Sequence, residues 1–98
     1  MADYWLTFRI ADDATYQARY GEFIEIVNDW GTGFWDGPTS FIAIRTDHDI
    51  DSFGRALKTA INEQSDLFVI RQIGKDDTRY AGDPGEGFAA FFPKAKKL

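Results

Sequence analysis

The chain has 98 residues, of which 44% are hydrophobic and 16% aromatic, with a formal net charge of −5 and no cysteine. This length and apolar content predict one packed domain and argue against a disordered chain. The acidic balance argues against general nucleic-acid binding, since a phosphate backbone is held by an excess of Lys and Arg.

Composition also bears on where the protein works. The lack of cysteine excludes disulfides, thiolate metal sites and cysteine nucleophiles, and it suits a reducing cytosol. The N-terminus has no basic signal-peptide region, and no apolar run approaches the roughly 18 residues of a membrane span. We therefore expect a cytoplasmic protein without a membrane partner.

The first half of the chain predicts a helix between strands. Alternating apolar residues indicate the strands, and apolar residues spaced by three and four indicate the helix. Asp12 and Asp13 are suitable N-caps for this helix, and Asn28 with Gly31 suits its end. The predicted elements are a strand over residues 4–10, a helix over 16–27, a short edge strand over 32–35 and a strand over 39–46.

The second half predicts a second helix followed by two strands. Phe53, Leu57 and Ile61 recur every four residues after an N-cap at Asp47 or Asp49. A polar turn region then separates the last two strands. The predicted elements are this helix, a strand over residues 67–73, the turn region over 74–87 and an extra strand over the apolar run 88–93.

The order of these elements predicts the fold class. Strand, helix, short strand, strand, helix, strand is the split βαβ arrangement, so we expect an α+β, ferredoxin-like fold in one domain over residues 1–98, with an extra C-terminal strand. Helices cover one face of such a sheet, so each strand alternates between the core and an outer face.

The outer face should carry an apolar patch. A soluble monomer would rarely leave such a patch open. The final strand, a second subunit or a ligand should therefore cover it. The expected interface residues are Trp5, Thr7, Phe41, Ala43, Leu67 and Val69.

Three arginines, Arg9, Arg45 and Arg71, follow apolar residues on the long strands and fall on the same outer face. The first strand runs opposite to the other two in this arrangement, which places Arg9 near one end of the face and the other two near the opposite end. They are candidate phosphate contacts at the rim of the apolar patch.

No catalytic constellation stands out. The single histidine, His48, lies among aspartates before the second helix, where capping explains the cluster more simply than a metal site. Trp30, Phe34 and Trp35 resemble a base-stacking platform, yet closure of the core explains them more simply. Tyr80, in the long loop, could stack on a ligand. The simpler interpretation is that it only anchors a solvated loop. We predict no catalytic residue, no metal ligand and no cofactor.

Motifs within residues 3–73 are similar to those of one protein family. The matching residues are Tyr16, Ser40, Arg45, Thr46 and the run 66–70. The chain thereby resembles the small bacterial proteins of SinR-like and CRISPR-associated endoribonuclease-like type, which include virulence-associated protein D. This resemblance implies a ferredoxin-like homodimer, often completed by a C-terminal strand added to the neighbouring subunit.

The first strand departs from that family at a position that matters for mechanism. The resemblance implies a metal-binding Asp at the end of this strand in the nuclease members, whereas this chain has Arg9 there. A cation cannot coordinate Mg²⁺, so the nuclease activity is not carried over. Asp12 or Asp13 could replace that ligand or hold a divalent ion between two subunits, although N-capping explains both more simply.

The sequence therefore predicts a homodimeric, non-enzymatic interaction module that meets its partner across the outer sheet face. The alternative is a metal-dependent endoribonuclease or another nucleic-acid-handling protein, with Asp12 or Asp13 at the metal ion and the arginines on phosphate. A toxin-like or antitoxin-like regulatory partner is a third reading.

Overall fold

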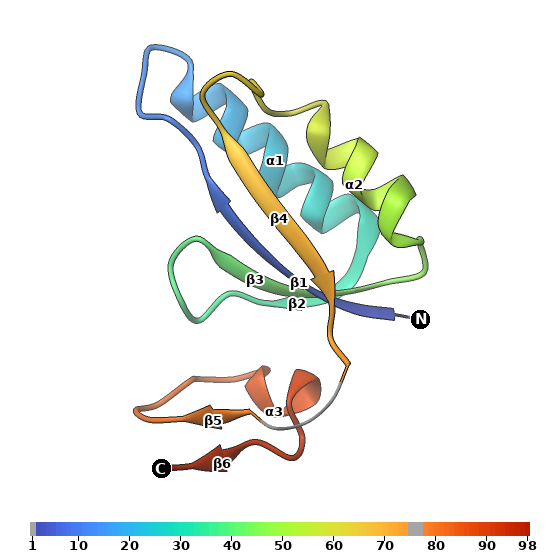
Figure 1. The fold of residues 1–98 in the computed structure, drawn as a ribbon, viewed down its shortest axis with the longest axis vertical. Coiled ribbons are helices and arrows are strands. Elements are labelled where there is room, and N and C mark those ends of the chain that lie inside the picture. The colour runs from blue at the N-terminus through green and yellow to red at the C-terminus, as the bar shows by residue number, and fades with distance from the viewer. Residues whose placement is uncertain (1, 75–77) are drawn as a thin grey trace.

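The computed structural model describes residues 2–74 and 78–98 and shows a mixed α+β fold (Figure 1). In the described residues, no helix is long and apolar enough to cross a membrane. The elements are β1 (Ala2–Arg9), α1 (Tyr16–Trp30), β2 (Gly31–Trp35), β3 (Phe41–Thr46), α2 (Ile50–Lys58), β4 (Leu67–Gln72), β5 (Arg79–Tyr80), α3 (Phe88–Phe91) and β6 (Lys96–Lys97).

The main sheet is antiparallel, with the strand order β2-β3-β1-β4. Trp5 of β1 lies opposite Ala43 of β3 on one side and opposite Arg71 of β4 on the other. The first strand therefore runs opposite to both of its neighbours, as expected. β2 and β4 are the two edges, and they differ: the register of β2 shifts between Gly31 and Gly33, whereas β4 pairs with β1 without a break.

The main core lies between the sheet and the helices α1 and α2, which cover one face (Figure 1). The predicted alternation is confirmed, because Leu6, Ile44 and Ile70 point into this core. Phe23 of α1 and Phe53 of α2 are fully buried against the same face. Burying an aromatic or large aliphatic side chain in this way stabilises the fold by about 1.5–3 kcal/mol.

The C-terminal segment, residues 78–98, lies on the opposite side of the sheet from α1 and α2 (Figure 1). Phe88 and Phe91 pack with Trp35 and Ala43 in a second apolar cluster. The indole N–H of Trp35 donates a hydrogen bond of 2.8 Å to the backbone oxygen of Pro84. The chain itself therefore covers the β2 and β3 side of the outer sheet face.

The strand predicted over residues 88–93 is wrong, because Phe88–Phe91 forms the short helix α3. Its aromatic residues recur at spacings of three and four, which gathers them on one side of a helical turn. The two residues between them are alanines, the strongest helix formers. The extra C-terminal strand is instead β6, which pairs in parallel with β5 in a separate two-stranded sheet.

Several predicted boundaries also shift. The N-cap of α1 is Thr15 rather than Asp12 or Asp13, and Asn28 lies inside the helix because only Gly31 ends it. Asp49 is the N-cap of α2 and accepts a hydrogen bond from the backbone N–H of Ser52 at 3.0 Å. The predicted polar turn region contains β5, and its residues 75–77 lie outside the described residues.

Candidate interaction surface on strand β4

The outer sheet face has a covered half and an open half. Ala43 is fully buried beneath the C-terminal segment, and Phe41 is half-buried in the same cluster. Trp5 stacks on Phe41 with ring centroids 6.2 Å apart, at the boundary between the halves. Of the expected interface residues, only Thr7, Leu67 and Val69 stay exposed, on β1 and β4.

Strand β4 is unusually open for a member of a packed sheet. All six of its residues are exposed or half-buried, whereas β3 is mostly buried. Leu67 and Val69 on the outer face are 52% and 46% exposed. Together with Thr7 and Arg9 they line a shallow hollow of about 120 Å³.

The opposite face of β4 is also flanked by apolar side chains. Phe68 and Ile70 are half-buried against the main core and form one wall of a groove of about 330 Å³ beside α2. Ile50, which is 37% exposed, lines the same groove. β4 therefore has accessible apolar residues on both of its faces.

In the described part of the chain, the edge of β4 has few of the devices that usually prevent strand pairing. Proteins protect their sheet edges with charges, prolines, bulges or covering segments. β4 contains no proline, and its one charged residue, Arg71, is close to its C-terminal end. On the other edge of the sheet, the register shift at Gly31 and Gly33 interrupts β2. β4 is thus the edge better suited to pair with another strand.

The three arginines on the outer face have different surroundings. Arg45 donates hydrogen bonds to the Asp3 carboxylate at 2.8 and 3.0 Å, which raise the pKa of its guanidinium, and it lies 5.3 Å over the ring of Phe91. Arg45 therefore fastens the C-terminal segment to the sheet. Arg71 is exposed at the same end of the face, and Arg9 is exposed at the other.

Asp13 and Asp66, which lie in different loops, share an ion-pair network that the sequence did not reveal. Arg19 of α1 pairs with Asp13 at 2.9 Å and with the fully buried Asp66 at 2.9 Å. Burial alone would raise the pKa of the Asp66 carboxyl. Hydrogen bonds from Arg19 and from the backbone N–H groups of Asn62 and Ala11 outweigh burial and hold that pKa well below its usual range. This network ties the β1–α1 loop to the α2–β4 loop.

The other candidate residues do not converge on a reaction centre. His48 lies against the ring of Trp30, with the centroids 4.3 Å apart, and Trp30 packs on the main core. Trp35 belongs instead to the second cluster, and Phe34 is exposed on β2, so the three aromatic residues do not share one platform. In residues 2–74 and 78–98, no group of three or more His, Cys, Asp or Glu could hold a metal ion.

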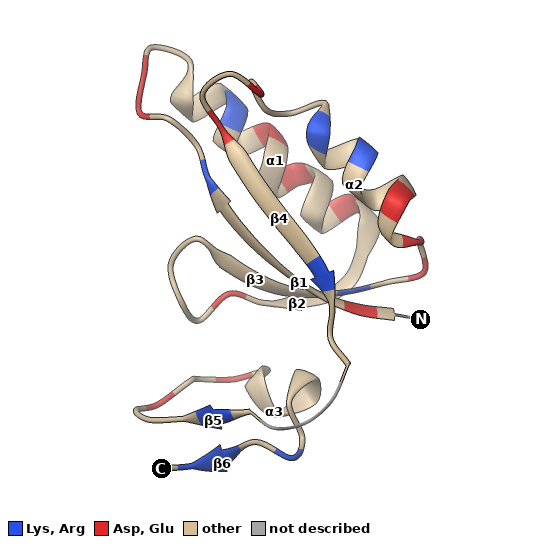
Figure 2. Cartoon of the chain, viewed as in Figure 1, with Lys and Arg blue, Asp and Glu red and all other residues tan. Residues whose placement is uncertain are grey.

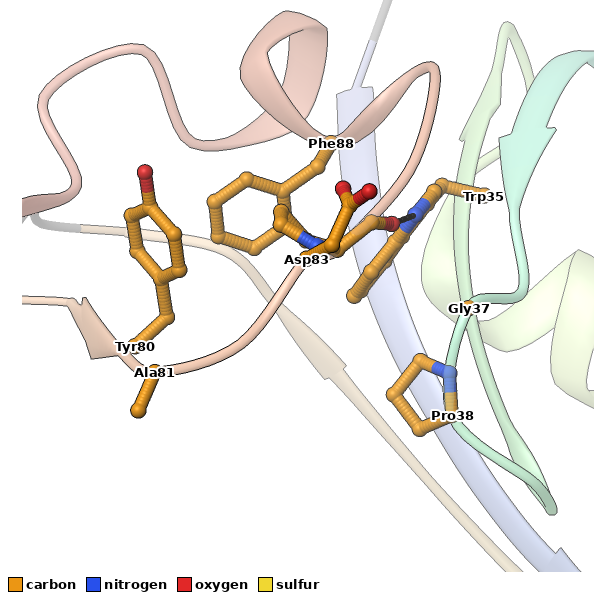
Figure 3. Close-up of a pocket in the computed structure, with 8 residues that line it drawn as sticks. Trp35, Gly37, Pro38, Tyr80, Ala81, Asp83 and Phe88 are labelled. Carbon is orange, nitrogen blue, oxygen red and sulfur yellow. Dashed lines mark hydrogen bonds between the residues drawn. The ribbon is translucent and has the colours of Figure 1, made fainter. Parts of the chain in front are cut away.

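A cleft of about 300 Å³ lies where the C-terminal segment meets the sheet (Figure 3). Tyr80 and Phe88 line it, with ring centroids 5.0 Å apart, and Trp35 forms another part of its wall. Two polar groups that line the cleft have partners within the chain, since Trp35 donates to Pro84 and Asp83 accepts from the backbone N–H of Gly85 at 2.9 Å. Packing of the Tyr80 ring on Phe88 anchors this part of the C-terminal segment.

No protein-family model matches the chain, and the search of curated proteins finds no significant relative. The resemblance to SinR-like and CRISPR-associated endoribonuclease-like proteins therefore stays a prediction.

Proposed function

We propose that this domain, of ferredoxin-like topology, is a non-enzymatic interaction module that works as a homodimer through β4. The observation that carries the proposal is the pair Leu67 and Val69, which are about half exposed on a regular edge strand, in the half of the outer sheet face that the C-terminal segment leaves open. A cytoplasmic location belongs to the proposal, because a chain without cysteine suits a reducing compartment.

Burial of this edge offers a clear energetic gain. Full burial of a Val or Leu side chain is worth about 1.5–3 kcal/mol, so covering the exposed half of Leu67 or Val69 contributes about 1 kcal/mol each. Ile50, Phe68 and Ile70 add apolar area on the other face of the strand. Backbone hydrogen bonds along a paired edge add specificity, as in other cases of strand addition.

The test is the molecular mass in solution of the native chain and of two matched variants. Val69→Asp places a charge at the proposed contact. Phe34→Asp makes the same change at a residue of similar exposure, 45% against 46%, on the opposite sheet edge. An unpaired charge in a buried contact costs several kcal/mol, so Val69→Asp should weaken the dimer at least about a hundredfold.

Sedimentation equilibrium over the micromolar range should show a native dimer, a dimeric Phe34→Asp variant and a monomeric Val69→Asp variant. Circular dichroism checks that both variants keep the native fold. A native chain that stays monomeric throughout this range overturns the proposal, and so does a dimer that only Phe34→Asp dissociates.

The ribonuclease alternative has less support in the geometry. The Asp13 carboxylate accepts hydrogen bonds from Arg19 and from the backbone N–H of Thr15. The hydrogen bond from Arg19 is the main reason why the pKa of Asp13 is lowered. Asp12 is exposed on the same loop. Incubation of the protein with labelled RNA and Mg²⁺ or Mn²⁺ should give no cleavage. Cleavage that disappears in Asp12→Asn or Asp13→Asn would favour the enzyme instead.

A further inference from the structure

We infer that two copies of the chain join β4 to β4 in antiparallel register about a twofold axis at Val69, with the two α2 helices side by side. This inference rests on the proposed homodimer and specifies its geometry. The antiparallel sheets of the two copies would then continue into each other across β4. A twofold interface of this kind must be complementary to itself, and β4 with α2 meets that requirement.

The strand register follows from the alternation of side chains. A twofold axis perpendicular to the sheet keeps the outer faces of the two copies on the same side, so outer residues must lie opposite outer residues. An axis at Val69 places Val69 opposite Val69 of the second copy and Phe68 opposite Ile70. Leu67 then lies opposite Arg71, whose aliphatic stem can cover it.

Other registers bury less of the exposed apolar surface. An axis at Phe68 pairs only residues 67–69 within the strand. An axis at Ile70 leaves Leu67 outside the pairing and sets Val69 opposite Arg71. The Val69 axis is the register that covers the accessible apolar residues on both faces of β4.

The charges on α2 complement a second copy of the same helix. Asp51, Gly54, Arg55 and Lys58 recur at spacings of three and four, so they form one helix face, and all four line the groove beside β4. Figure 2 shows acidic residues at the start of α2 and basic residues toward its end.

The twofold axis reverses the direction of the second helix, which brings Asp51 opposite Lys58 of the second copy. Arg55 then lies opposite Gly54, where an added Cβ would meet no atom within 4 Å, so the Arg55 side chain has room. Lys58 is free to exchange partners, because its ion pair with Glu63 spans 3.8 Å between two exposed side chains.

The test uses reciprocal charge reversal. Asp51→Lys alone and Lys58→Asp alone each create two like-charge pairs per dimer, and each should weaken self-association about tenfold. An equimolar mixture of the two variants restores an opposite-charge pair on both sides, so it should form heterodimers about as tightly as the native chain. Native mass spectrometry distinguishes the three species by mass.

The double variant Asp51→Lys/Lys58→Asp is the internal control, because it carries the same changes to the helix ends while keeping opposite charges across the axis. It should dimerise like the native chain. If both single variants lose affinity and neither the mixture nor the double variant recovers it, helix damage explains the loss and the inferred pairing is wrong.

A disulfide test reads the strand register directly. The chain has no cysteine, so Val69→Cys introduces a single thiol. Two such thiols at the axis fall within disulfide range, since directly paired residues have Cα atoms about 4.5–5.5 Å apart. Thr7→Cys is the control, because it is exposed on the same face but three strand spacings, about 14 Å, from its copy.

Under a mild oxidant, the Val69→Cys chain should become a covalent dimer and the Thr7→Cys chain should stay uncrosslinked. This register is wrong if Val69→Cys crosslinks no faster than Thr7→Cys and charge reversal has no effect on dimerisation. If the native chain is still dimeric, the proposed homodimer stands. A monomeric native chain overturns both.

Discussion

Replacing Asp66 by Asn should lower the free energy of unfolding more than replacing Asp13 by Asn. These two residues are the carboxylates that pair with Arg19. The Asp66 side chain is fully buried and accepts hydrogen bonds of 2.9 Å from Arg19 and from the backbone N–H groups of Ala11 and Asn62. An amide has one acceptor atom in place of two, and its NH₂ group would face donors.

The size of this effect follows from burial. Removing one partner of a buried ion pair costs about 3–5 kcal/mol, against a total stability of about 5–15 kcal/mol for a domain of this size. Asp13→Asn is the matched control, since it removes the exposed partner of the same Arg19 and should cost much less. Urea unfolding followed by tryptophan fluorescence, at one fixed protein concentration, measures both changes.

The same pair of proteins gives a pH test with a defined sign. The pKa of Asp66 is lower in the folded chain than its unfolded value of about 3.9, so its stabilising contribution is complete above that pH and is lost as the pH falls toward the folded pKa. The stability gap between the native chain and Asp66→Asn should therefore narrow by about 1 kcal/mol between pH 7 and pH 3. A gap that is no larger than that of Asp13→Asn, or that does not narrow, would refute this reasoning.

Three backbone predictions concern Ser40 and Gly37, in the loop before β3, and Gly21 in α1. Ser40 has a φ of 57°, in the left-handed region, so Ser40→Gly should raise the free energy of unfolding by about 1 kcal/mol; an unchanged or lower value in urea unfolding counts against it. Gly37→Ala should lower the melting temperature, because the new Cβ would lie 2.6 Å from the Trp35 ring. In Gly21→Ala, in α1, the new Cβ meets no atom within 4 Å, so the free energy of unfolding should rise by about 0.5–1 kcal/mol. Equal effects of Gly37→Ala and Gly21→Ala on stability would contradict this reasoning.

Local periodicity explains what the sequence could predict. The alternation in β1, β3 and β4 assigned Leu6 and Ile44 to the core and Leu67 and Val69 to the outer face, because a period of two depends only on neighbouring residues. The helices α1 and α2 were predicted from their local periodicity in the same way, whereas α3 was not. Their ends shifted by a few residues because several polar residues could cap each one.

Features that depend on distant contacts could not be predicted in this way. Arg19 and Asp66 are 47 positions apart, and nothing local marks them as a pair. The run 88–93 is apolar enough for a strand although it also has helix-forming alanines, and the position of its helix over Ala43 depends on distant packing against Trp35. The groove beside α2 was missed too, although Asp51, Arg55 and Lys58 recur on one helix face in the sequence.

Hydrogen exchange along β4, measured as a function of protein concentration, tests the claim that this edge is the dimer interface most directly. Among residues 2–74 and 78–98, β4 is an edge of the main sheet, so its N–H groups that point away from β1 face no further strand in a monomer. Pairing with a second copy would slow their exchange. We predict that these amides become protected as the concentration rises through the dimerisation range while those of β2 do not change. Equal exchange of the β4 amides in monomer and dimer would contradict the account.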